Sequence, residues 1–298
     1  MSMNDFYNEA IWEKAWKDQS EIMLKKMQKA GVDFSHSFDP KAKTFNEQSF
    51  SEEGRKRSRR IINWLEGQGV GFENTSVLDI GAASGVFTVP FAERGARVTA
   101  LESSPPLVEL LEENIAKFAD DQVSIVHEPF EHIDVQDKGW GEAFDLVFVS
   151  MCPVILDWES VEKVLYCARK YCYISMPVTH NEHSLLQEIW PLITGQSFKK
   201  KPLEMGYLLH LLYLKGYSYE SLVTREMKTK EVTHEAALQE VMTMLGHYGL
   251  SVDEKAVRTV AGYLEQAYPS GRVAVQEGGR FGKVLIRLQD QSMYSKED

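Results

Sequence analysis

The chain has 298 residues, 43% of them hydrophobic, and a formal net charge of −11 at pH 7. That length and apolar content suffice for one elaborated domain, or for one domain with a cap. The negative charge repels polyphosphate backbones and therefore disfavours a nucleic-acid partner.

The three cysteines, Cys152, Cys167 and Cys172, lack the paired spacing of a zinc site or a disulfide framework. Reduced thiols, no metal ion and a cytoplasmic location are therefore expected. No stretch reaches the roughly 18 apolar residues of a membrane span, so no membrane association is expected.

The N-terminal part, residues 1–70, is predicted to be a helical segment. Apolar residues recur at helical spacing over residues 5–30, the polar stretch 33–50 suggests a loop, and residues 51–66 form a second helical pattern. Trp12 and Trp16 belong to the first pattern. Packing on the core is the ordinary explanation for them, and a lid over a ligand is the functional alternative.

From residue 76 the pattern changes to short apolar runs that alternate with helical stretches. This alternation predicts a parallel sheet with crossover helices, a core over residues 71–180. Pro90 falls inside the first helical stretch, so that helix is either kinked or begins later than residue 85. The predicted strands are residues 77–80, 97–101, 123–127, 144–149 and 171–176, and the predicted helices are residues 85–94, 105–118 and 158–169.

The remainder, residues 181–298, is predicted to be a helical cap with final strands that complete the sheet. Strands are expected at 217–228 and 281–288, with turns at Pro269–Gly271 and Glu277–Gly279. Tyr207 and Tyr213 lie in this apolar cap, which suits a small or partly apolar ligand. The predicted helices are residues 183–194, 203–215, 234–247 and 253–267.

The segment from Asp79 to Gly85, followed by Glu102 at the end of the next apolar run, has the pattern of a nucleotide-binding strand, turn and helix. A dinucleotide site would require glycine at positions 81, 83 and 86. This chain has Gly81, Ala83 and Val86, which disfavours a nicotinamide or flavin cofactor. The turn suits a smaller cofactor.

The order Asp79-Ile80-Gly81-Ala82-Ala83-Ser84-Gly85, then Glu102, then Phe144-Asp145-Leu146-Val147 resembles the class I S-adenosylmethionine-dependent methyltransferases. The resemblance covers residues 76 to about 178. It implies a doubly wound α/β fold with a mostly parallel seven-stranded sheet, and S-adenosylmethionine as cofactor with S-adenosylhomocysteine as product. It also implies that the turn holds the methionine part of the cofactor and that Glu102 binds the ribose hydroxyls. The cofactor-binding residues implied are Asp79, Gly81, Ala82, Ala83, Gly85, Glu102, Ser103, Phe130, Ser150 and Met151.

The fourth strand ends in Ser150-Met151-Cys152-Pro153, where some members of that family carry Asn-Pro-Pro-Tyr, the mark of amino-group methylation on nucleobases or glutamine. Nothing nearby indicates such an acceptor. If a proton must leave the acceptor, His180, Asp157 and Glu182 follow strand ends and are candidate bases, although an ordinary surface position is the simpler explanation for each of them.

The expected function is methyl transfer from S-adenosylmethionine to a small molecule, by a monomer or a homodimer. One alternative is an RNA or protein methyltransferase that docks its substrate on the basic run Arg55–Arg60, which a solvated helix face would also explain. Another is a non-catalytic, cofactor-binding subunit.

Overall fold

The computed structural model describes residues 3–29, 39–179, 182–199 and 204–289. The chain divides into two compact units. One contains residues 1–176, 206–222 and 283–298, and the other contains residues 177–205 and 223–282. The N-terminal helices therefore belong to the same unit as the parallel strands.

The first unit is built on a parallel sheet, as the alternating pattern predicts. Its strands are β1 (Ser76–Ile80), β2 (Arg97–Leu101), β3 (Val123–Val126), β4 (Phe144–Ser150) and β5 (Ala168–Pro177). They pair in the order β3-β2-β1-β4-β5, and the pairs β1–β2, β1–β4, β2–β3 and β4–β5 are all parallel. The order reverses beside β1, which places the carboxyl ends of β1, β2 and β4 around one crevice.

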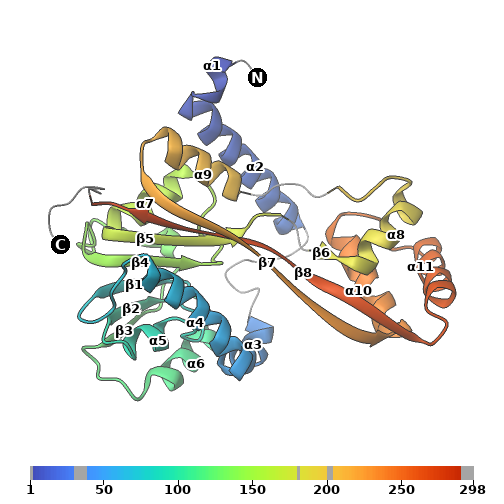
Figure 1. Cartoon of the computed structure of the whole chain (residues 1–298), viewed down its shortest axis with the longest axis horizontal. Helices are drawn as coiled ribbons and strands as arrows, with labels where there is room; N and C mark the ends of the chain where they lie inside the picture. Colours follow the sequence, from blue (N-terminus) through green and yellow to red (C-terminus); the bar gives the residue numbers. More distant parts are fainter. Residues whose placement is uncertain (1–2, 30–38, 180–181, 200–203, 290–298) are drawn as a thin grey trace. The chain divides into compact units, whose positions relative to one another are not determined.

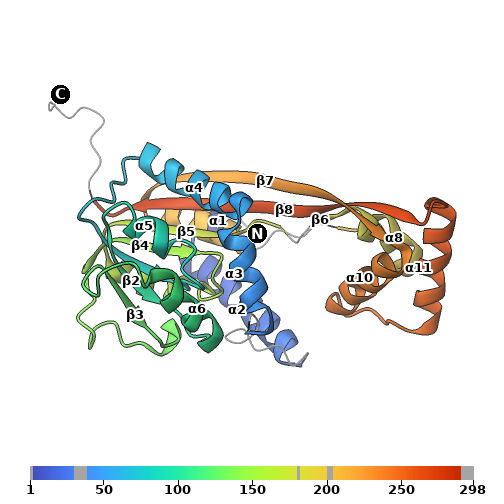
Figure 2. The ribbon, with the colours of Figure 1, turned by 90° about the horizontal axis from the view of Figure 1, so that it is seen from below.

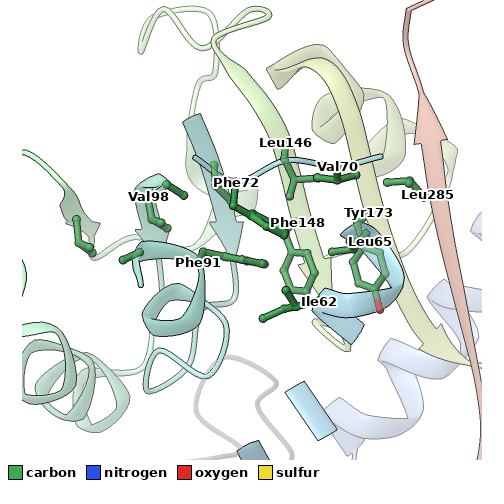
Figure 3. Packing of buried hydrophobic residues seen from close by; sticks show 14 residues of the cluster. Ile62, Leu65, Val70, Phe72, Phe91, Val98, Leu146, Phe148, Tyr173 and Leu285 are labelled. Atoms are coloured by element: carbon green, nitrogen blue, oxygen red, sulfur yellow. The ribbon is translucent and has the colours of Figure 1, made fainter. Parts of the chain in front are cut away.

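Helices cover both faces of this sheet, which makes the fold doubly wound. Figure 1 shows α4 (Glu52–Gly67), α5 (Thr88–Ala92) and α6 (Pro105–Ile115) on one side of the strands and α7 (Trp158–Cys167) on the other. The core between α4, α5 and the strands contains Ile62, Phe91 and Phe148, all fully buried (Figure 3). The mixed α/β class with a mostly parallel sheet is thus confirmed, and the described residues contribute eight strands to the sheet.

The position of Pro90 is explained by a late helix start. Helix α5 begins at Thr88, so Pro90 lies in its first turn, where a missing N–H costs no intrahelical hydrogen bond. The connection between β1 and α5 is correspondingly longer than the sequence pattern indicates.

The expectation of a loop over residues 33–50 is wrong from residue 39 onwards. Residues 30–38 lie outside the described part, but a 3-10 turn, η1 (Asp39–Lys41), leads into helix α3 (Ala42–Phe50). Helix α3 is polar in sequence and is held by tertiary contacts instead, including a 2.9 Å hydrogen bond from Asn114 to Asn46. A Cβ at Gly54 of α4 would overlap the carbonyl oxygen of Gln48, so glycine permits the close approach of α3 and α4.

The N-terminal helices α1 (Met3–Phe6) and α2 (Glu9–Lys29) confirm the first helical pattern. Helix α2 packs along α7, and Ser20 donates a hydrogen bond to the carbonyl oxygen of Leu156. Helix α9 (Met205–Leu214) meets α2, because the Tyr207 hydroxyl donates to Gln19 at 3.2 Å.

The second unit has its own core, built from α8 (Ser184–Thr194), α10 (His234–His247) and α11 (Glu254–Ala267), which lie together in Figure 2. Strand β6 (Glu182–His183) pairs antiparallel with β8 (Arg272–Arg287), and β7 (Ser218–Thr233) also pairs with β8. Both β7 and β8 are longer than predicted, and both contribute residues to each unit.

The predicted turn at Glu277–Gly279 is wrong, because these residues continue β8. A Cβ at Gly278 would overlap the carbonyl oxygen of Glu226, so this glycine marks a close approach of two backbones rather than a reversal of the chain. Such an approach leaves the same sequence signal as a turn.

Candidate active site

The glycine-containing turn between β1 and α5 is folded by left-handed backbone angles. Gly81, Ala83 and Gly85 have φ of 72°, 50° and 90°. The amides of Gly81 and Ala82 both donate to the carbonyl oxygen of Leu101 at 2.9 Å, which ties the turn to the end of β2. Ala83 adopts its angle despite a side chain, at a cost of about 1 kcal/mol.

Close neighbours explain the two glycines. A Cβ at Gly81 would lie 2.5 Å from the Cys152 sulfur, and one at Gly85 would lie 2.9 Å from a Leu111 methyl group. The turn is therefore held against the segment that follows β4 on one side and against α6 on the other.

The Glu102 carboxylate at the end of β2 is fixed by three backbone amides. Its Oε2 accepts from Ala83 at 2.8 Å, and its Oε1 accepts from Ser103 and Ser104 at 2.9 Å each. A carboxylate offers about four acceptor positions, so about one remains on Oε2 for a ligand hydroxyl. This geometry makes Glu102 both a brace for the turn and an acceptor suited to a ribose.

Asp79 is a buried carboxyl group, 2% exposed, whose Oδ2 accepts a 2.6 Å hydrogen bond from the Thr88 hydroxyl. No described cation pairs with it. Burial raises the pKa of Asp79 to about 7, the Thr88 hydrogen bond opposes that rise, and the charge of Glu102 adds to it. A ligand that carries an ammonium group would supply the missing positive charge, so the site fits such a cofactor.

The segment after β4 places Cys152 beside Gly81 of the turn, and Ser150 and Met151 directly precede it. Ser150 Oγ lies 3.1 Å from Ser175 Oγ, and Met151 is exposed, with a left-handed φ of 56°. Burial raises the pKa of the Cys152 thiol to about 12. The thiol therefore stays protonated near neutral pH and is a poor nucleophile.

Phe130 and Ser103 occupy different settings. Ser103 lies in the loop after Glu102, with its carbonyl oxygen 3.3 Å from His127 Nε2. Phe130 begins a 3-10 turn, η2 (Phe130–His132), and its ring is 2% exposed beneath the Lys163 ammonium group, 4.6 Å away. Phe130 therefore has little free surface to offer a ligand.

Of the three candidate bases, the structure describes Asp157 and Glu182, which belong to different units. Asp157 caps helix α7, because its Oδ1 accepts a hydrogen bond from the Ser160 amide at 2.8 Å. Its Oδ2 takes no part in this cap. His180 lies outside the described residues. Glu182 belongs to the second unit, is 4% exposed and forms ion pairs with Arg225 and Arg280.

Three of the four aromatic lid candidates do meet. The Tyr207 ring stacks on Trp16 at 6.1 Å and lies 6.2 Å from Trp12, whereas Tyr213 is 61% exposed. The structure adds His210, whose ring is 4.5 Å from Trp12. Tyr207 and His210 are three residues apart on α9 and so lie on the same helix face, and this spacing could have predicted that His210 belongs to the cluster.

A cluster that the sequence analysis missed lies in the second unit. Ligand atoms of His183, Glu240 and Glu277 lie within 4.8 Å of one another. Lys230 bridges the two glutamates at 2.6 and 2.7 Å, and His183 Nδ1 accepts the Leu186 amide. That hydrogen bond places the neutral ring's proton on Nε2, and Lys230 supplies the positive charge between the two glutamates. Strand pairing across β6 and β8 creates this cluster, and sequence spacing gave no signal.

Residues 77–172 match the family model of the methyltransferase domain. EEF1A lysine methyltransferase 2 of Danio rerio is 29% identical over 93 residues, which are 31% of this chain and 40% of that protein. The 23S rRNA (uracil(1939)-C(5))-methyltransferase RlmD of Enterobacter sp. (strain 638) is 35% identical over 91 residues, 30% of this chain and 20% of that protein. The chain thus spans well under two thirds of these relatives.

Among solved structures, the YcgJ protein of Bacillus subtilis has a TM-score of 0.47 at 10% identity, covering 79% of this chain and all of that one. Within the described residues, no helix combines the length and the apolar character needed to cross a bilayer.

Proposed function

We propose that this chain, whose residues 77–172 form a class I S-adenosylmethionine-dependent methyltransferase domain, transfers the methyl group of that cofactor to a small-molecule acceptor. The observation that carries the proposal is the pair of carboxyl groups at the turn. Glu102 keeps an acceptor position next to the turn amides, and buried Asp79 has no cation partner among the described residues.

The roles of the chain's own groups follow from this geometry. The bound cofactor supplies a methyl group on a sulfonium leaving group, so the protein mainly has to align the acceptor with it. Asp79 stabilises the cofactor's ammonium group directly or through water, and Glu102 accepts from the ribose. Ser150 and Met151 border the acceptor side. Asp157 and His180 remain candidate bases for acceptors that must lose a proton.

The proposal of a small acceptor rests on charge and on the aromatic cluster. A chain of net charge −11 disfavours RNA, and the partly exposed rings of Trp12, Tyr207 and His210, packed around the fully buried Trp16, offer an aromatic surface on α2 and α9. We assign acceptor contact and cofactor cover to this cluster. The two curated relatives are named for protein and rRNA acceptors, and these are the rival acceptors.

Calorimetric titration with S-adenosylhomocysteine tests the cofactor site. Glu102→Ala removes a charge-assisted acceptor and should weaken binding about tenfold or more. Glu109→Ala, an exposed acid on α6, is the matched control and should bind like the wild type. Equal affinity for all three proteins would exclude Glu102 as the ribose ligand.

Labelled S-adenosylmethionine, added with a cell extract, tests the acceptor class. After separation into an ultrafiltrate and retained macromolecules, the label is expected in the ultrafiltrate. Label in RNA or protein would contradict the small-molecule proposal. No transfer to any fraction, by a protein that still binds S-adenosylhomocysteine, would indicate the non-catalytic alternative.

A further inference from the structure

A cavity of about 390 Å³ lies between helices α3, α4, α5 and α6 of the first unit. Its apolar wall includes Phe50, Ile62, Val89 and Pro90. Its described lining includes none of the carboxyl groups or turn residues assigned to the cofactor. The cavity is therefore lined by a different set of residues from the proposed cofactor site.

Positive charge surrounds this cavity. Four cationic side chains line it, against the two acidic side chains of Glu93 and Glu113. The excess of positive charge is local, since the whole chain has a net charge of −11. The cationic residues are Arg55, Arg59, Arg94 and Lys117.

The cations on the α5 and α6 side are already paired. Arg94 Nε contacts Glu66 at 3.0 Å and its Nη1 donates to the carbonyl oxygen of Pro90, while Lys117 contacts Glu93 at 2.5 Å. These pairs hold that wall in place and leave little charge to attract a ligand.

The two arginines of α4 that line the cavity, Arg55 and Arg59, have no such ion pairs among the described residues. Arg55 donates through Nε to the carbonyl oxygen of Phe50 at 2.9 Å, with its guanidinium group 5.9 Å from the Phe50 ring. This contact orients the side chain, and its two terminal nitrogens have no acceptor among the described residues. Arg59, one helical turn later, has no ion-pair or hydrogen-bond partner in the described part of the chain. Two guanidinium groups four residues apart lie on one helix face, with unused donors.

We propose that this cavity binds a small organic anion, whose phosphate or carboxylate oxygens are held by Arg55 and Arg59 and whose apolar part lies against Phe50, Ile62 and Val89. Arginine forks bind such oxygens in pairs, which suits a compact anionic group. The acidic side chains of Glu93 and Glu113 in the lining and the limited volume favour a small ligand over a long polyanion.

The cavity also adjoins the cofactor turn through Asn114, one of its lining residues. The Asn114 amide donates to Asn46 on α3 and to the carbonyl oxygen of Ser84 in the turn, both at 2.9 Å. Val86 and Val89, which line the cavity, directly follow that turn. An anion in the cavity therefore contacts the helix that leads out of the cofactor site.

Calorimetric titration of the full chain tests the proposal, with pyrophosphate as the phosphate probe and citrate as the carboxylate probe, at matched ionic strength in sodium chloride. Saturable binding of at least one probe is expected. Arg55→Gln and Arg59→Gln should each weaken it about tenfold or more, the loss expected for a charge-assisted hydrogen bond. Arg57→Gln, exposed on the same helix and absent from the cavity lining, is the matched control and should leave binding unchanged.

The outcomes are distinguishable. Binding of pyrophosphate alone or of citrate alone supports the proposal and identifies the anionic group. No saturable binding of either probe by the wild type overturns it, and so does an equal loss in all three variants, which would indicate diffuse surface charge. RNA binding that falls steeply with salt and is weakened equally by Arg57→Gln would also overturn it, in favour of a docking surface on α4. Affinity for S-adenosylhomocysteine, measured on each variant, shows that the variants are folded.

Discussion

Two effects act on the protonation of Asp79 in opposite directions. Burial favours the neutral carboxyl group, and the ammonium group of a bound cofactor favours the charged one. The Asp79 pKa of about 7 means that the folded protein keeps a proton that the unfolded chain loses near pH 4. Between these values the folded state binds more protons than the unfolded state, so the free energy of unfolding falls as pH rises from about 4 to about 7. Above pH 7 Asp79 is ionised in both states, so its contribution to the free energy of unfolding no longer changes with pH.

Asp79→Asn should therefore raise the free energy of unfolding at pH 8 by about 2–4 kcal/mol, because the amide carries no buried charge and can still accept from Thr88. Urea denaturation at pH 8 and pH 4 measures this, and the gain should disappear at pH 4. A variant less stable than the wild type at pH 8 would contradict the buried-charge explanation.

The same substitution should affect cofactor binding in the opposite sense. The cofactor's ammonium group favours charged Asp79, so wild-type affinity for S-adenosylhomocysteine should rise as pH increases from 6 to 8. In Asp79→Asn the affinity should be lower and that rise should be lost. A parallel pH profile in both proteins would mean that another group sets the dependence.

Ala83 offers a second test at the scale of a residue, since its φ of 50° strains a side chain. Ala83→Gly should change the free energy of unfolding by less than about 1 kcal/mol, because the relieved strain offsets the greater entropy of glycine in the unfolded chain. Ala83→Val should destabilise by about 2 kcal/mol. Thermal unfolding of both variants checks the contrast, and equal behaviour of glycine and valine would contradict it.

Single elements are stabilised by contacts that sequence spacing does not reveal. His183 is 4% exposed and caps helix α8 through Nδ1, and burial lowers the pKa of its ring despite the nearby Glu240 and Glu277. Below pH 6.5 the unfolded chain therefore binds a proton at His183 more readily than the folded state does. The stability that depends on neutral His183 is present above pH 6.5 and is lost as pH falls below it.

His183→Asn keeps an oxygen that can cap α8 and removes the titrating ring. The wild type should lose more stability than this variant when the pH falls from 7.5 to 5.5. Guanidinium denaturation at the two pH values, followed by circular dichroism, measures the difference. A greater loss in the variant would show that protonation of His183 stabilises the fold through Glu240.

The secondary structure shows where sequence patterns suffice. Strands β1 to β5 were predictable because each is a short apolar run whose burial depends on composition alone. Helix α3 was not predictable, because its polar sequence is stabilised by Asn114 on α6. The length of β8 was not predictable either, because a glycine such as Gly278 gives the same sequence signal in a turn and in a close contact between strands.

At the scale of the molecule, the cofactor residues could be predicted and the acceptor side could not. The turn and Glu102 are contiguous in sequence, whereas the aromatic cluster joins α2 to α9 across almost 200 residues. The cavity likewise draws its lining from four helices. Contacts of this kind follow from the fold rather than from local spacing.

All ten residues assigned to the cofactor lie in the first unit. Saturation with S-adenosylhomocysteine should therefore slow amide hydrogen exchange at residues 81–88 and 102–104 and leave α10 and α11 unchanged. Exchange measured by mass spectrometry with and without the compound tests this. Strong protection of α10 or α11 would show that the second unit also contacts the cofactor.

Strand β8 contributes to the core of the first unit but is translated after almost all of the second unit. Leu285 is fully buried among the side chains of β1, β4 and β5 (Figure 3), yet more than 100 residues separate it from the end of β5. A ribosome must translate the whole second unit before this strand is available. The sheet that carries the cofactor turn therefore stays incomplete on a nascent chain, and a premature stop codon anywhere in the second unit removes part of the first.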